Sequence, residues 1–119
     1  GEVALWFAPL AAGGRADADG VWVGPEGGRL GAALAAAGDV DGDGRIDLIV
    51  GAPLADAAYL VTGITGGTSP IAAVAASTLH GLGDTVAGAG DPNGDGYADV
   101  VAGACDPLGT STVALFLGG

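Results

Sequence analysis

The sequence predicts an all-β fold built from a repeated unit, and three observations support this. The apolar runs are short, rich in β-branched or aromatic residues, and closed by Gly, Pro or Asp, which is typical of strands. Residues 30–53 align without a gap with residues 82–105, at an offset of 52. Residues 3–7 (VALWF) also resemble residues 113–117 (VALFL), at an offset of 110, or roughly two repeat lengths. Both ends of the sequence are therefore expected to carry the same strand of the repeat.

In chain order, strands are expected at residues 3–8, 20–24, 32–36, 46–51, 57–62, 72–79, 85–88, 98–103 and 112–117. The Ala-rich run 32–37 has helical propensity, but it is too short between Gly31 and Gly38 to form a helix. Segment 70–78 leaves a helical turn open as an alternative to a strand. The Gly-rich segments 9–20 and 63–70 are expected to be connections.

The repeat divides the chain into three parts. Residues 1–29 are expected to hold the terminal strands of a preceding unit, and residues 30–81 form the first repeat. Residues 82–119 form the second repeat, whose last strand is missing or is supplied by another copy. No long linker separates these parts, so independent domains are not expected.

Composition excludes several functions. The chain has 14 acidic residues, three Arg and no Lys, for a net charge of −11. Nucleic-acid binding is therefore not expected, and neither is a polybasic membrane contact. No apolar stretch is long enough for membrane insertion. The single cysteine, Cys105, excludes an internal disulfide framework and is expected to be a buried small residue or an intermolecular link.

Two acidic loops, residues 39–47 and 91–99, carry the strongest chemical signal. Each places side-chain oxygens at loop positions 1, 3, 5 and 9, with Gly at position 6 to allow a sharp turn. A backbone carbonyl at position 7 can add a further oxygen. Ca²⁺ takes six to eight oxygen ligands, so the sequence predicts two calcium sites. The predicted ligands are Asp39, Asp41, Asp43, Arg45 (carbonyl) and Asp47 in the first site, and Asp91, Asn93, Asp95, Tyr97 (carbonyl) and Asp99 in the second.

Other interpretations of the loops are weaker. Solvated Asp-Gly turns are the simplest alternative, but the same ligand positions recur in both loops. Mg²⁺ prefers fewer protein ligands and more water. An EF-hand needs a Glu at position 12, where this chain has Val50 and Ala102. Seven of the 14 acidic residues lie in the two loops, and two Ca²⁺ ions would bring the net charge from −11 to −11 + 4 = −7.

The order of these motifs resembles the FG-GAP repeat of integrin α-subunit β-propellers, relatives of which occur in secreted bacterial proteins. The matching residues are LG at 30–31, GDVDGDG at 38–44 and DLIVGAP at 47–53. The second copy has LG at 82–83, GD at 90–91, NGDG at 93–96 and Asp99. Leu30 stands where the family usually has Phe, and Cys105 replaces the Pro of the motif.

The resemblance implies that each repeat is a four-stranded antiparallel propeller blade, with the metal loop between its first and second strands. In the family the calcium ions are mostly structural, and the ligands would fall on the ten residues given above. The chain holds about two blades, whereas a closed propeller has ~4–8, so it is incomplete as a closed propeller. An extracellular location, secreted or at the cell surface, is also implied.

No catalytic site is predicted. His80 is the only His, so neither a zinc site nor a Ser-His-Asp triad has enough partners. It is expected at a strand end or on the surface. The aromatic residues are expected between the blades rather than in a ligand platform; they include Trp6, Phe7, Trp22, Tyr97 and Phe116.

Three functions fit these observations. The favoured one is an extracellular calcium-binding structural repeat that self-assembles through strand pairing, as a fibre or a ring. Its partners would be copies of itself or further repeats of the same chain. The alternatives are a ligand-binding or adhesion propeller of which this chain is a part, and a non-catalytic part of a secreted hydrolase.

Overall fold

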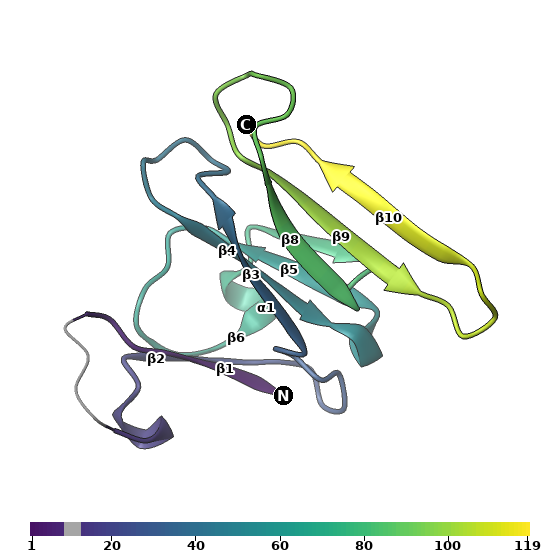
Figure 1. Ribbon diagram of the computed structural model, residues 1–119. Coiled ribbons are helices and arrows are strands. Elements are labelled where there is room, and N and C mark those ends of the chain that lie inside the picture. Colours follow the sequence, from purple (N-terminus) through teal and green to yellow (C-terminus); the bar gives the residue numbers. More distant parts are fainter. Residues whose placement is uncertain (9–12) are drawn as a thin grey trace.

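The computed structural model describes residues 1–8 and 13–119, and it confirms the predicted all-β class. The strands form three sheets that follow one another in space, as Figure 1 shows. The first sheet contains β1 (Glu2–Leu5), β2 (Gly20–Val23) and β6 (Gly67–Pro70), the second β3 (Ala33–Gly38), β4 (Asp47–Ala52), β5 (Ala57–Val61) and β7 (Ser77–His80), and the third β8 (Thr85–Gly90), β9 (Asp99–Cys105) and β10 (Ser111–Phe116). Short helical turns are η1 (Arg15–Asp17), η2 (Pro53–Ala55) and α1 (Ile71–Val74).

The second and third sheets repeat the same backbone pattern. The antiparallel ladder of β3 with β4 has the same register as the ladder of β8 with β9, at the 52-residue offset of the sequence repeat. Each ladder has one irregularity directly before the acidic loop, at Gly38 and at Gly90. These glycines have φ of 83° and 73°, in the left-handed region that favours Gly. The repeat therefore preserves both the strand pairing and the way each strand enters its loop.

The core lies in two layers, one on each face of the second sheet. Alternate residues of a strand point to opposite faces. Val50 and Tyr59 accordingly pack toward the first sheet, and Ile49 and Leu60 toward the third. The first layer includes Val3, Trp22, Leu30, Ala52, Ala57, Val61 and Ile71, and the second includes Ala37, Val40, Ala58, Leu82, Val100 and Ala102. Because β4 and β5 are covered on both faces, the second sheet organises the whole described structure.

The two outer sheets differ from the four-stranded second sheet. In the described part of the chain, β10 pairs with β9 and has no partner on its other side, where the second sheet has β7 beside β5. Among the described residues β1 pairs only with β2, which stands beside β1 as β7 stands beside β5. The similarity of residues 3–7 and 113–117 thus corresponds to two strands in the same position of a blade. Neither outer sheet closes, which agrees with an incomplete propeller.

Three predicted elements are wrong in part. The strand predicted at 72–79 is divided: residues 71–74 form α1, the helical turn that was the alternative for segment 70–78, and only Ser77–His80 form a strand. The predicted connection 63–70 contains β6, which pairs in parallel with β2. The strand predicted at 3–8 ends at Leu5. Residues 9–12 of the predicted connection 9–20 lie outside the described residues, and residues 15–17 form η1.

The aromatic residues divide between core and surface. Trp22 is 2% exposed and packs between the first and second sheets, as predicted. The prediction is wrong for Trp6 and Phe7, which are 41% and 45% exposed. They follow the end of β1, so the ladder no longer directs their side chains toward the core. Phe116 packs partly buried against the second core layer, and Tyr97 is exposed in its loop.

Candidate metal centre

Each acidic loop joins the first two strands of its sheet, as the resemblance implied. Residues 39–46 connect β3 to β4, and residues 91–98 connect β8 to β9. The position-6 glycines, Gly44 and Gly96, have φ of 82° and 92°. A side chain at either position would strain the backbone, so Gly is favoured in the sharp turn that curls the loop. The curl brings alternate side chains toward one another.

The first acidic residue of each loop organises the loop backbone. Oδ1 of Asp39 accepts hydrogen bonds from the N–H groups of Gly42 (2.8 Å) and Asp43 (3.0 Å). Its Oδ2 accepts one from the N–H of Gly44 at 2.9 Å. Asp91 accepts the three equivalent bonds in the second loop, at 2.8, 3.1 and 2.9 Å. The two loops differ in sequence at several positions, but in each the carboxylate at position 1 accepts the same three N–H groups and holds the same curl.

Further predicted ligands meet in the first loop. Asp39, Asp41 and Asp43 each offer a carboxylate oxygen within 4.8 Å of the others. In the second loop Asn93 takes the place of Asp41, and its Nδ2 donates to Oδ2 of Asp95 at 2.8 Å. The first loop therefore concentrates three carboxylates, whereas the second relieves part of the repulsion through an amide.

The position-9 carboxylates, Asp47 and Asp99, are both fully buried where β4 and β9 begin. Oδ2 of Asp47 accepts a hydrogen bond from the N–H of Val40 at 2.8 Å, but its Oδ1 has no partner. Oδ2 of Asp99 has no partner either. Burial raises the pKa of Asp47, and the nearby charges of Asp41 and Asp43 raise it further. A buried carboxylate oxygen without a partner is costly, and a cation would remove that cost.

The residues therefore fit a hard divalent cation. The donor set is carboxylate and amide oxygen throughout, which Ca²⁺ prefers. The buried unpartnered oxygens of Asp47 and Asp99 give an independent reason for a cation beside each loop. At position 7, Arg45 and Tyr97 each donate their N–H to the position-5 carboxylate, at 2.8 and 2.9 Å. The carbonyl ligands from these two residues remain a prediction.

One contact that holds a predicted ligand was missed from the sequence. In the first repeat, the N–H of Val40 orients Asp47. The second loop has Pro92 at that position, and proline has no N–H to donate. The N–H of Gly118 takes this role and donates to Oδ1 of Asp99 at 2.8 Å. Pro92 is the one signal of this contact in the sequence, because a proline at this position predicts that the N–H donor to Asp99 comes from another segment.

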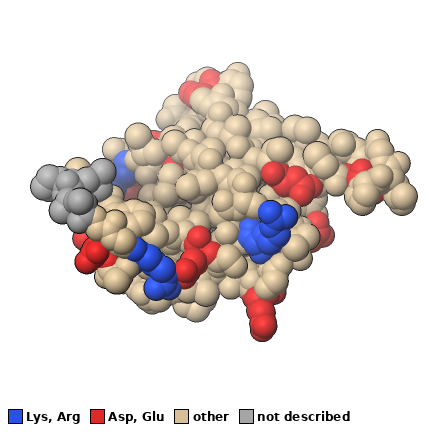
Figure 2. Space-filling model, turned by 60° about the horizontal axis from the view of Figure 1, so that its bottom comes forward, with Lys and Arg blue, Asp and Glu red and all other residues tan. Residues whose placement is uncertain are grey.

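Acidic side chains are also distributed outside the loops. On the face drawn in Figure 2 they form several separate patches rather than one continuous surface. Arg15, an exposed residue, pairs with Glu2 at 2.6 Å, which lowers the pKa of Glu2 and raises that of Arg15. The shared geometry of the two loops, rather than general acidity, therefore distinguishes them.

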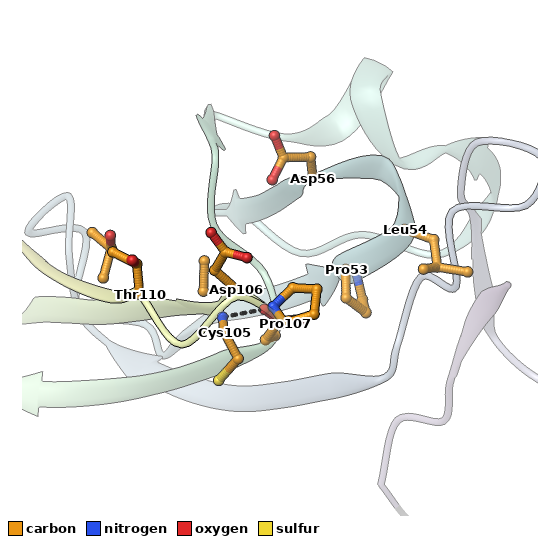
Figure 3. A pocket seen from close by; sticks show the side chains of 10 residues that line it. Pro53, Leu54, Asp56, Cys105, Asp106, Pro107 and Thr110 are labelled. Atoms are coloured by element: carbon orange, nitrogen blue, oxygen red, sulfur yellow. Dashed lines mark hydrogen bonds between the residues drawn. The ribbon is translucent and has the colours of Figure 1, made fainter.

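An open pocket of about 460 Å³ lies between η2 and the residues around the end of β9 (Figure 3). Cys105 lines it and is exposed, so the prediction of a buried cysteine is wrong. Asp84 also lines the pocket, and its Oδ2 accepts the N–H of Cys105 at 2.6 Å. Asp106 accepts the N–H of Leu108 at 2.8 Å. His80 is exposed at the end of β7, and it is not among the residues that line the pocket.

Comparison with known proteins supports the repeat. The family model described as FG-GAP-like repeat matches residues 39–102, from the first ligand of the first loop into β9. The comparison with curated proteins gave no match. Within the described ranges, no helix is long and apolar enough to span a membrane. Because the matched stretch covers more than half of the 119 residues, the chain belongs to the FG-GAP-like repeat family.

Proposed function

We propose that the chain is an extracellular, calcium-stabilised structural repeat whose two loops each hold one Ca²⁺ ion. FG-GAP repeats occur in extracellular or cell-surface proteins and are structural or ligand-binding units rather than an enzyme class. The observation that carries the proposal is the buried carboxylate at the end of each loop. Asp47 and Asp99 each keep one oxygen without a hydrogen-bond partner, next to a loop of further oxygen donors.

The ions would act on stability rather than on a reaction. Each would neutralise carboxylates that repel one another and would hold the loop between two core strands. A ligand that binds only the folded state stabilises it by RT ln(1 + [L]/Kd), which is about 2.7 kcal/mol at 100 times Kd. The proposed role is therefore to fix the junction between the first two strands of each blade.

Thermal unfolding tests this role. We expect the thermal midpoint to rise by several degrees on addition of millimolar Ca²⁺ and to return after a chelator is added. The same measurement with Mg²⁺ should give a smaller rise, because Mg²⁺ retains more of its water. Superimposable curves in Ca²⁺ and in chelator would contradict the proposal.

We further propose that the blades are completed by copies of the chain or by further repeats of the same kind. The unpaired side of β10 supports this, since an open strand edge is a template for another strand. β1 and β10 occupy the same blade position, so β10 of one copy could take the place of β1 beside β2 of the next. Such an exchange is head-to-tail and gives a ring or a fibre, depending on whether the rotation closes.

A further inference from the structure

The two metal loops touch each other, although they belong to different sheets. The N–H of Ala98, in the second loop, donates to the carbonyl oxygen of Asp39 at 2.9 Å. The ring of Tyr97 lies against Gly42, so closely that a Cβ added there would stand 2.6 Å from Cε1 of the tyrosine. The N–H of Gly119 donates to the carbonyl of Val40 at 2.9 Å. Two contacts therefore connect the loops directly, and a third connects the first loop to the residues after β10.

These contacts fall between predicted ligands. Ala98 stands between Tyr97 and Asp99, both predicted ligands of the second site. Its hydrogen-bond partner, Asp39, is the first ligand of the first site and organises that loop through three N–H groups. Ordering either loop therefore fixes backbone atoms that the other loop needs.

We propose that the two calcium sites are coupled, so that Ca²⁺ in one loop increases the affinity of the other through the Ala98–Asp39 and Tyr97–Gly42 contacts. This inference rests on the proposed calcium function. Binding of the first ion orders backbone that both loops share, with a loss of conformational entropy. The second ion then binds a loop that is already partly ordered, so its binding loses less entropy. Coupling of this kind needs no change in the shape of either site.

Electrostatic repulsion between the two ions opposes this coupling, so the ordering of shared backbone has to outweigh it. Residues 39–47 carry four Asp and one Arg, for a formal charge of −3, which one Ca²⁺ changes to −1. Residues 91–99 carry three Asp, for a formal charge of −3, which one Ca²⁺ also changes to −1. A filled loop therefore still attracts the second cation, but less strongly than an empty loop does.

The test is a calcium titration of the full chain, followed by NMR at one amide in each site. The N–H of Gly44 donates to Asp39 and the N–H of Gly96 donates to Asp91, so these two signals report the sites separately. Asp95→Asn weakens the second site and Asp43→Asn the first, each with a side chain of nearly unchanged shape. Both variants keep an oxygen that can accept the N–H of the position-7 residue.

We expect Asp95→Asn to weaken binding at Gly44 by about fivefold or more, and Asp43→Asn to weaken binding at Gly96 by the same factor, because coupling is reciprocal. Tyr97→Ala, which keeps the carbonyl ligand, should reduce that factor, whereas Tyr97→Phe, which keeps the ring, should preserve it. The two Asp variants carry the test even if Tyr97→Ala does not fold.

Three outcomes would overturn the proposal. If the affinity of each site changes by less than twofold when the other site is weakened by substitution, the sites are independent. The calcium function then stands without the coupling. Coupling that is unchanged in Tyr97→Ala overturns the assignment to the tyrosine contact. Titration signals from neither Gly44 nor Gly96 would overturn the calcium function itself, and the coupling with it.

Discussion

Gly118 donates its N–H to Oδ1 of Asp99 at 2.8 Å, and it thereby ties the residues after β10 to the carboxylate that begins β9. Gly118 is packed so closely against the carbonyl oxygens of Ala98 and Val40 that a side chain would not fit. In the first repeat the corresponding donor, Val40, belongs to the loop itself. The buried carboxylate of the first repeat is therefore held from within its own loop, whereas that of the second repeat is held by a residue that follows β10.

Ending the chain at Leu117 should weaken the second site more than the first. The truncation removes a hydrogen bond to a charged group, and such bonds contribute about 1.5–3 kcal/mol. We expect calcium affinity at the second site to fall by on the order of tenfold, with a smaller effect at the first site through the lost Gly119–Val40 contact. Titration followed at the Gly44 and Gly96 amides measures both.

Pro92→Val in the truncated chain is the matched control for that prediction. It restores an N–H at the position where Val40 donates in the first repeat. Part of the lost affinity at the second site should return. Equal weakening of both sites, with no recovery in Pro92→Val, would show that Gly118 has no specific role toward Asp99.

The two sites should differ in affinity, and a reciprocal pair of substitutions should exchange them. The first site has four carboxylates, whereas the second has three and Asn93. Calcium affinity follows the number of charged ligands. Asn93→Asp should therefore tighten the second site, and Asp41→Asn should weaken the first, each by on the order of tenfold. Calorimetry on both variants checks the order, which is wrong if Asn93→Asp leaves the second site unchanged.

Asp47→Asn should have opposite effects with and without calcium. In chelator it removes a buried charge whose Oδ1 has no partner, so the free energy of unfolding should rise by about 1 kcal/mol. In millimolar Ca²⁺ it removes a ligand charge, so the calcium-dependent gain in stability should shrink. Urea unfolding under both conditions measures the two values. A variant that destabilises the protein equally in both would mean that Asp47 is only a structural residue.

Assembly should depend on β10. Val113 and Leu115 are 72% and 51% exposed on this edge strand. Lysine on an edge strand opposes further pairing, so Val113→Lys with Leu115→Lys should shift a calcium-containing sample toward small species in sedimentation. Leu108→Lys is the control, because Leu108 is 90% exposed but lies outside the strand. Deletion of residues 111–119 should act in the same direction.

A chain that sediments as a monomer in Ca²⁺, with no change in these variants, would exclude self-assembly. Blade completion by further repeats of the same chain would then be the remaining proposal. Loss of the larger species on chelation would connect the two parts of the proposed function, because neutralised loops lower the repulsion between highly acidic copies.

The sequence predicted the repeated part of the fold well, because each repeat carries the same local signals. Alternating or fully apolar runs predicted β4, β5 and β9, and the glycines of the loops predicted where the chain turns. The Ala-rich run before the first loop was predicted as a strand despite its helical propensity, and it forms β3. Its pairing with β4 outweighs the intrinsic preference of alanine.

The parts that were missed depend on contacts between distant residues. β6 has the sequence of a Gly-rich connection and becomes a strand only because β2 is available beside it. The contact of Gly118 with Asp99 and that of Ala98 with Asp39 join segments from different strands or loops. No local pattern marks such contacts, although the proline at position 92 indicates that one donor is absent. The candidate ligands could be named from the sequence, but the atoms that orient them could not.

The most direct test of the account is the number of Ca²⁺ ions that the chain binds, measured by calorimetric titration of metal-free protein. The account predicts two ions per chain, a reduction to one well-bound ion in Asp43→Asn and in Asp95→Asn, and heat that includes ordering of the loops. Binding of no ion, or of many weak ions with no change in these two variants, would mean that the loops are acidic turns and would contradict the account.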